Sequence, residues 1–167
     1  SLLTKDYGPF IRYCFILTDA EFEATPIQTP HLCDKCKKCV KACHGGAISE
    51  EGKVDPWQCA VYYNGANGSK NPFMPPEAYA DFENRADIIT GNVKVTPETA
   101  AEIMSNTYFY PPAKHFYRSS ICGRACDRAC YIHLEEKGLL SKKFNKPFRE
   151  GEDWKLDLAQ FNLEKNE

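Results

Sequence analysis

Apolar and polar positions along the chain predict short elements joined by long irregular segments. Residues 10–17 form an aromatic and β-branched run, FIRYCFIL, which predicts a buried strand. Two prolines, Pro26 and Pro30, then predict an extended linker. Residues 47–55 place apolar positions on both sides of Glu50-Glu51-Gly52, which predicts a small hairpin.

The second half of the chain predicts helices. A short helix is predicted over residues 76–84. Thr96-Pro97-Glu98 supplies a capping residue, a proline at the first helical position and an acidic first turn, which predicts a helix to about Ser105. A longer helix is predicted from residue 119 or 120 to Gly138, because glycine commonly follows a helix C-terminus.

These elements divide the chain into three parts. Residues 1–30 form a strand-containing lead-in, which we expect to be the end of an upstream domain. Residues 31–140 form one domain with an insertion at about 60–118. Residues 141–167 carry twelve charged side chains among apolar ones, which predicts an arm docked through its apolar side and not a disordered tail.

Composition adds one unusual feature, which is cysteine. The 167 residues carry a net charge of −2, so no global basic field favours nucleic acid, and no apolar run is long enough to span a membrane. Nine residues are cysteine, at positions 14, 33, 36, 39, 43, 59, 122, 126 and 130. Gaps of two and three residues favour metal ligation over disulfides, because neighbouring cysteines rarely meet disulfide geometry.

The first cysteine group has the spacing Cys33-x2-Cys36-x2-Cys39-x3-Cys43. This is the spacing of bacterial ferredoxins, in which three cysteines wrap one [4Fe–4S] cluster and the fourth binds a different cluster. Zinc sites usually pair two CxxC hooks at longer range, so zinc is the less favoured alternative.

The second group, Cys122-x3-Cys126-x3-Cys130, supplies the remaining ligands. On one helix, a spacing of four residues places all three side chains on one face, with the outer two about 12 Å apart along the axis. The bland alternatives are a cysteine-rich core stripe and, for Cys59, a buried core residue. Counting ligands predicts two sets of four: Cys33, Cys36, Cys39 and Cys130 for cluster one, and Cys43, Cys59, Cys122 and Cys126 for cluster two. Cys14 is left over, and we expect it to be a packed free thiol in the 10–17 strand.

The flanking sequence extends the comparison beyond the cysteines. Residues 31–48, together with residues 3–8, 18–20 and 54–59, resemble the C-terminal half of epoxyqueuosine reductases, and corrinoid-dependent reductive dehalogenases show a similar layout. This resemblance implies a ferredoxin-like module that feeds electrons to a corrinoid-binding domain, which would precede Ser1. The chain differs from these families at His44, where they usually have proline, and in having three residues in both gaps of its second motif.

The side chains around the cysteines suggest a partner surface. Lysines crowd the first motif, at Lys35, Lys37, Lys38 and Lys41. They predict either a docking face for a redox partner or upstream domain, or an ordinary solvated surface. The four histidines are not needed as ligands, because eight cysteines already satisfy two clusters.

Together these features predict an α+β protein built on a two-cluster ferredoxin-like module. The predicted function is electron transfer through two [4Fe–4S] clusters, as part of an oxidoreductase or as an independent carrier, and the electron-transfer part of an oxidoreductase is favoured over a catalyst by itself. The alternative is a structural metal-binding interaction domain without a redox role. Thiolate clusters suit a reducing compartment, so a cytoplasmic location is expected.

Overall fold

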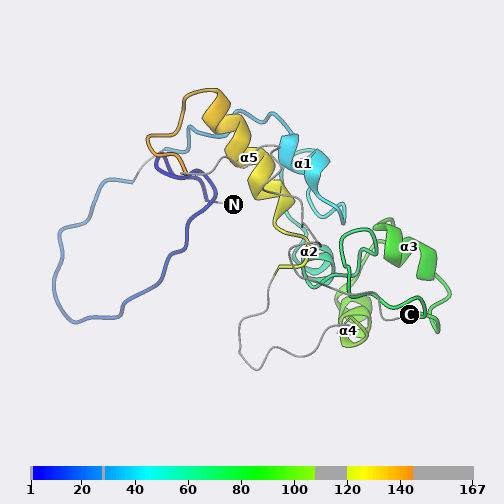
Figure 1. The fold of residues 1–167 in the computed structure, drawn as a ribbon. Coiled ribbons are helices and arrows are strands. Elements are labelled where there is room, and N and C mark those ends of the chain that lie inside the picture. The colour runs from blue at the N-terminus through cyan, green and yellow to red at the C-terminus, as the bar shows by residue number, and fades with distance from the viewer. Residues whose placement is uncertain (1, 28, 108–119, 145–167) are drawn as a thin grey trace, which may run out of the picture.

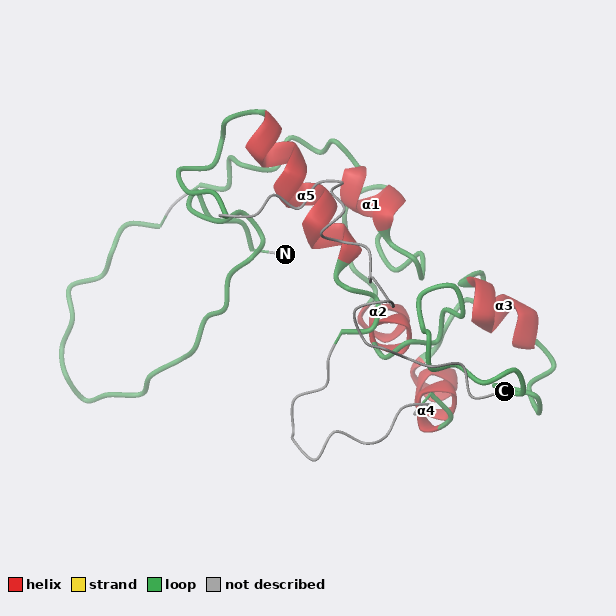
Figure 2. Ribbon diagram, viewed as in Figure 1, coloured by secondary structure: helices red, strands yellow, loops and turns green. Residues whose placement is uncertain are grey.

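The computed structural model describes residues 2–27, 29–107 and 120–144 (Figure 1). The described residues contain five helices: α1 (Lys38–Ala42), α2 (Pro56–Tyr63), α3 (Arg85–Thr90), α4 (Pro97–Ser105) and α5 (Ala125–Glu136). Figure 2 shows these helices joined by long loops, and the described residues form no extended strand. Two isolated β-bridges, Thr4–Gly8 and Ile48–Val54, are the β-structure of the described part.

Two hydrophobic clusters hold the described residues together. The smaller cluster lies where α5 meets the N-terminal turn, α1 packs beside α5, and the buried members of this cluster are Leu32, Tyr131, Leu134 and Leu140. The larger cluster joins α2, α3 and α4, and its buried members are Val61, Tyr62, Ala66, Ala78, Tyr79, Ile88, Val95, Ala100 and Ile103. The predicted insertion therefore builds a hydrophobic core of its own against α2.

The best-defined helix starts follow directly from local sequence. The side chain of Asp55 accepts hydrogen bonds from the backbone N–H groups of Trp57 and Gln58 and so caps α2. The side chain of Thr96 accepts one from the backbone of Thr99 and caps α4. The helix predicted from the Thr96 cap is confirmed, with its end at Ser105.

A buried glutamine fixes α2 to the segments around it. Gln58 is 2 % exposed, and its amide nitrogen donates to the carbonyl oxygens of Gly45 and Val93 at 2.8 and 2.7 Å. Its amide oxygen accepts from the N–H of Val95 at 2.9 Å. One side chain thus satisfies three buried backbone groups, each of which would otherwise cost about 1–3 kcal/mol to leave unpaired.

The expectation of a buried strand at residues 10–17 is wrong. Phe15, Ile16 and Leu17 are 87 %, 82 % and 98 % exposed, and the chain from Arg12 onward forms an open loop (Figure 1). Cys14 is exposed as well, so the expectation of a packed thiol there is also wrong. The physical reason is that a strand needs a neighbouring edge for its backbone, and the described residues place none beside this segment.

The hairpin is confirmed, whereas the short helix is misplaced. Ile48 and Val54 form the bridge of the hairpin, and Gly52 turns it with φ of 85°. Residues 76–84 form turns in place of the predicted helix, and α3 begins only at Arg85. Tyr79 adopts φ of 57°, which a right-handed helix cannot include.

The long helix is shorter than predicted at its N-terminal end. Gly123 and Arg124 have φ of 61° and 49°, so α5 begins at Ala125 and not at residue 119 or 120. Its end agrees with the prediction, because Gly138 takes the left-handed conformation two residues after the helix. Most of the predicted C-terminal arm, and residues 108–119 of the insertion, lie outside the described residues.

Candidate metal centre

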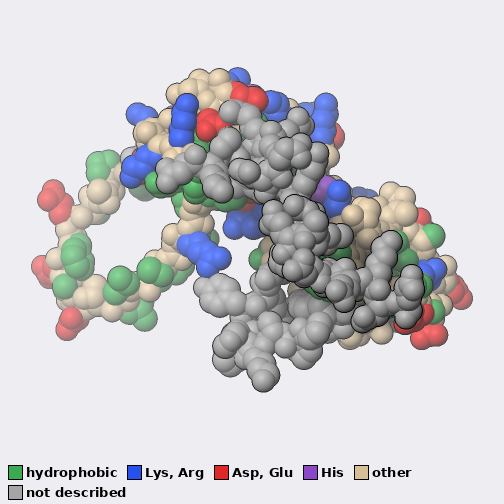
Figure 3. Space-filling view, viewed as in Figure 1, with side chains coloured by type: hydrophobic (Ala, Val, Ile, Leu, Met, Phe, Trp, Pro, Cys, Tyr) green, Lys and Arg blue, Asp and Glu red, His purple; other side chains and the backbone are tan. Residues whose placement is uncertain are grey.

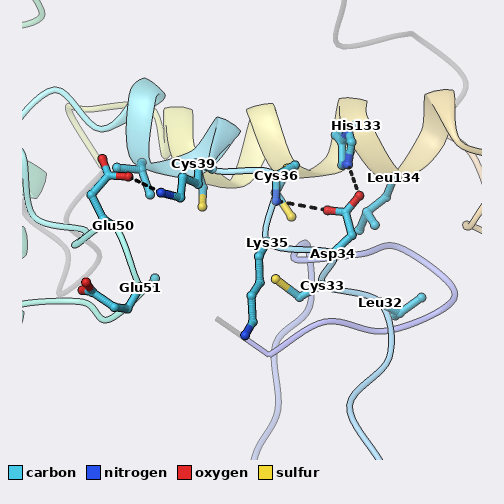
Figure 4. A pocket seen from close by; sticks show the side chains of 14 residues that line it. Leu32, Cys33, Asp34, Lys35, Cys36, Cys39, Glu50, Glu51, His133 and Leu134 are labelled. Atoms are coloured by element: carbon cyan, nitrogen blue, oxygen red, sulfur yellow. Dashed lines mark hydrogen bonds and ion pairs between the residues drawn. The ribbon is translucent and has the colours of Figure 1, made fainter.

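The four cysteines predicted for cluster one line a single open cavity (Figure 4). Cys33 and Cys36 come from the loop before α1, Cys39 from the first turn of α1, and Cys130 from α5. Cys33 and Cys36 are exposed, whereas Cys39 and Cys130 are half-buried. Sulfur atoms separated by up to 97 residues in sequence therefore converge on one space that opens to solvent.

The loop that presents Cys33 and Cys36 has an unusual backbone. Lys35 and Lys37 adopt φ of 58° and 59°, a left-handed conformation that costs non-glycine residues about 1–2 kcal/mol. The backbone N–H of Cys36 donates to the carboxylate of Asp34 at 3.2 Å, which closes the turn. Two left-handed residues in alternation curl the loop around the cavity in place of continuing α1 backward.

Asp34 ties this loop to α5. Its carboxylate accepts from His133 Nε2 at 2.8 Å and from the ammonium group of Lys137 (Figure 4). Hydrogen bonds from Lys137 first, and then from His133, hold the pKa of the Asp34 carboxyl far below its usual range. We call the contact of Asp34 with His133 and Lys137 the Asp34 anchor. The potential metal-binding atoms of Asp34, Cys36 and His133 all lie within 4.8 Å of one another, so this anchor directly borders the cavity.

The thiols predicted for cluster two also influence one another. Burial raises the pKa of Cys59, and the neighbouring thiols of Cys122 and Cys43 raise it further. Burial, then Asp127, then the thiols of Cys43 and Cys122 raise the pKa of Cys126 to about 11. All four cysteines of this set are half-buried. They form a second group of thiols, apart from the exposed loop.

Cys130 belongs electrostatically to the first group. Burial raises its pKa to about 12, and the thiols of Cys39, Cys36 and Cys33 add to the rise. Cys59 and Cys126 thus interact with Cys43 and Cys122, and Cys130 interacts with Cys33, Cys36 and Cys39. The assignment of these eight cysteines to two clusters stays a prediction. With their raised pKa values, the thiols of Cys59, Cys126 and Cys130 keep their protons at neutral pH unless a cation replaces them.

Two sulfur atoms of the second group take part in hydrogen bonds. The backbone N–H of Ala47 donates to Cys43 Sγ at 3.3 Å. The hydroxyl of Ser120 lies 3.2 Å from Cys122 Sγ. Hydrogen bonds to ligand sulfur stabilise the thiolate form and help to set cluster potentials, so the donor set fits an iron–sulfur centre.

The prediction that Cys122, Cys126 and Cys130 share one helix face is wrong. Cys122 precedes α5, because the left-handed Gly123 and Arg124 break the helix between Cys122 and Cys126. The segment before this break contacts α2, the helix that carries Cys59. The N–H of Ile121 donates to the carbonyl of Tyr63 at 3.0 Å, which ties the Cys122 segment to the end of α2.

The lysines of the first motif divide into two kinds. Lys37 pairs with Glu50 at 2.6 Å, and Lys38 pairs with Glu136 at 3.3 Å. Lys35 and Lys41 are exposed. Figure 3 shows Lys and Arg side chains gathered over the part of the molecule that contains α1 and α5, while acidic side chains mark the outer edge of the exposed N-terminal loop.

Three residues at the site escape the sequence reasoning. His133 is not needed as a cluster ligand, but it binds Asp34. The signal in the sequence is its position three residues after Cys130, which places both side chains on the same face of a helix. Gln58 and Asp127 each lie next to a predicted ligand cysteine in the sequence, but only their burial, 2 % and 3 % exposed, reveals their importance. Polar residues beside cysteines carry no such signal by themselves.

Nine free cysteines, four of which line one open cavity, make a thiol-rich site of the kind that binds soft metals. Part of the chain is similar to epoxyqueuosine reductases: 39 % identical to that of Listeria monocytogenes over 62 residues and 32 % to that of Gloeobacter violaceus over 83 residues. The Bacillus subtilis enzyme is 28 % identical over 85 residues. The expected resemblance is thus confirmed for 36–50 % of the chain, which spans only 16–25 % of these relatives' lengths.

Other comparisons are negative. No family model matches the chain, and no solved structure matches it. Within the described ranges, none of the helices has the length and apolar character that crossing a bilayer requires.

Proposed function

We propose that this chain is an electron-transfer module that carries electrons through two [4Fe–4S] clusters in a ferredoxin-like fold. The observation that carries the proposal is that Cys33, Cys36, Cys39 and Cys130, from two distant segments of the chain, line one open cavity. Cys33, Cys36, Cys39 and Cys130 would hold one cluster, and Cys43, Cys59, Cys122 and Cys126 the other. Such clusters supply one-electron chemistry at low potential, and the chain supplies the thiolates, the hydrogen bonds and the burial that tune it.

The donor chemistry favours iron–sulfur over zinc. Each group offers four sulfur donors, and the first has the spacing at which three cysteines wrap one cubane. In the two-cluster pattern the fourth cysteine of the run binds the other cluster, and Cys43, which raises the pKa of Cys59, is the residue that we assign to that role. A structural zinc site needs neither the shared run nor this exchange of ligands.

The acceptor is the second part of the proposal. The relatives that match the chain are reductases by name, so an attached or partner reductase is the acceptor that we propose. The solvent-facing Cys33 and Cys36 make the first cluster the one nearer to a partner. The exposed Lys35 and Lys41 beside it would favour an acidic docking surface.

The test is anaerobic reconstitution of the full chain, followed by iron and acid-labile sulfide analysis and EPR of the reduced protein. About eight irons per chain and two interacting S = 1/2 signals are expected. Cys130→Ser and Cys59→Ser should each remove one cluster and leave the other. Cys14→Ser is the matched control, because Cys14 is exposed and belongs to neither group, and it should keep the full iron content.

A structural metal domain is the competing outcome. Zinc in place of iron, or iron that no reductant reduces, would refute electron transfer and favour that alternative. About four irons in the unmodified chain would show that only one of the two thiol groups builds a cluster.

A further inference from the structure

One buried carboxylate lies between the two thiol groups. Asp127 is in the first turn of α5, one residue after Cys126 of the second group and three residues before Cys130 of the first. It is 3 % exposed, and among the described residues it is the one acidic side chain that is buried. A buried charge is costly unless it is paired, so its presence at this position calls for an explanation.

The charge of Asp127 is balanced from one side by Arg124. The guanidinium of Arg124 forms an ion pair with Asp127 Oδ2, and the Arg124 side chain is 42 % exposed. The guanidinium of Arg124 can reach Asp127 because the left-handed backbone of Arg124 ends the turn just before α5. The second carboxylate oxygen, Asp127 Oδ1, lies 4.0 Å from Cys126 Sγ. The pair therefore presents its negative end to the sulfur ligands.

Asp127 lies close to cysteines of both thiol groups. Its Oδ1 is near the sulfur of Cys126 in the second group. Residues three apart on a helix are neighbours on one face, so α5 also places Asp127 beside Cys130 of the first group. The guanidinium of Arg124 brings a positive charge to the same place. The same charge that disfavours a thiolate also disfavours an added electron on a metal cluster held by that thiolate.

We propose that the buried Asp127–Arg124 ion pair is a potential-setting element shared by both clusters, in which the Asp127 carboxylate lowers their reduction potentials and Arg124 offsets part of that effect. The inference rests on the proposed function. Each cluster gains one electron from a low-potential one-electron donor, and neither Asp127 nor Arg124 gains or loses a proton in that step. The two residues act through the clusters and are positioning residues.

The test compares reduction potentials in the reconstituted full chain, by redox titration followed by EPR. Asp127→Asn should raise both potentials by roughly 59 mV, which is a tenfold change in a one-electron equilibrium. Arg124→Gln should lower the potential of the second cluster, an effect of opposite sign. Asp127→Glu keeps the charge and should restore values close to those of the unmodified chain.

A matched control separates the local effect from overall charge. Asp81→Asn removes the same charge from an exposed site in the insertion and should leave both potentials unchanged. The proposal is overturned if Asp127→Asn shifts neither potential, shifts only one, or shifts them no more than Asp81→Asn does. Should Asp127→Asn fail to hold its clusters, the sign of the Arg124→Gln shift decides alone. Iron analysis of the unmodified chain comes first, so absence of clusters is recognised separately as failure of the proposed function, which removes this inference with it.

Discussion

The two thiol groups differ in how the chain builds them. Three cysteines of the first group come from seven consecutive residues, in a solvent-facing loop and the first turn of α1. The second group is assembled from three distant segments, and all four of its cysteines are half-buried. Sequence proximity specifies the first group, and tertiary packing specifies the second.

This difference teaches where each group is vulnerable. The first group depends on local turns, on the Asp34 anchor and on the small core around Tyr131. The second depends on the contacts that hold α2, the Gly45 turn and the insertion together, above all those of Gln58. Damage to the larger core should therefore affect the second group first, and damage near Tyr131 should affect the first group first.

The largest expected effect comes from Gln58→Leu. The substitution leaves three buried backbone groups without their partner, so the free energy of unfolding should fall by about 3 kcal/mol or more. Urea unfolding measures this loss, and iron analysis should show the second cluster lost before the first. Asn92→Ala removes an exposed amide from the same insertion and should change stability by less than about 0.5 kcal/mol. Equal losses of unfolding free energy from the two substitutions would contradict the inference that Gln58 holds α2 to the segments around it.

Phe144→Ala tests the small core beside the first group. The Phe144 ring packs on Tyr131, Tyr7 and Phe10, with ring centroids 5.2, 5.3 and 5.7 Å away. Because the ring is 38 % exposed, the expected loss is about 1–2 kcal/mol, measured as the shift of the urea midpoint. Phe15→Ala makes the same change at an 87 % exposed position and should have no measurable effect. A similar loss from both would mean that the exposed loop packs in solution.

Tyr79→Phe tests the larger core and its pH dependence. Burial raises the pKa of Tyr79 to about 12, and its hydroxyl lies 2.8 Å from that of Thr107. The folded state therefore favours the neutral phenol, and this contribution is complete below about pH 10 and is lost as the pH rises toward 12. Tyr79→Phe should cost about 1 kcal/mol at pH 7 and should weaken the decline in stability above pH 10.

Its control is a tyrosine with no such burial. Tyr13→Phe, at a 70 % exposed position, should change neither the stability at pH 7 nor its alkaline decline. An alkaline decline in the Tyr79→Phe protein as steep as in the unmodified chain would assign the effect to other groups, of which Tyr62 is the first to examine, because burial raises its pKa as well.

The smallest expected effect on global stability is that of Asp34→Asn, because Asp34 and its partner Lys137 are both partly exposed. The loop before α1 should open more often, seen as faster hydrogen exchange of the Cys36 amide, with little change in unfolding. The lowered pKa of Asp34 means that its contribution is present above about pH 4 and is lost as the pH falls below that. Asp19→Asn, in the exposed loop, is the control, and equal exchange rates in both variants would contradict the anchor.

The features that sequence predicts well are those with a local cause. The cap at Thr96, the turn at Gly52 and the stop at Gly138 each depend on a residue's own conformational preference. Counting ligands predicts that Cys33, Cys36, Cys39 and Cys130 act together, and these four line one cavity. The ligand set of Cys43, Cys59, Cys122 and Cys126 stays a prediction. Occupancy by two clusters stays a prediction.

The features that sequence misses depend on distant partners or on competing backbone states. Asp34 and His133 are 99 residues apart, so no window of sequence joins them. Arg124 is an ordinary helix former, yet it takes a left-handed conformation that moves Cys122 off the helix. The run at residues 10–17 has the composition of a strand, but composition cannot supply the neighbouring strand that it needs.

We expect substitutions in the exposed loop at residues 12–27 to change the solubility of this chain but not its stability. Its apolar side chains, including Phe22 and the fully exposed Ile27, contribute nothing to either core, so replacing them leaves the unfolding equilibrium unchanged. Large apolar side chains exposed close together favour self-association as protein concentration rises. We therefore expect polar substitutions in this loop to raise the solubility of the protein without altering the two thiol groups.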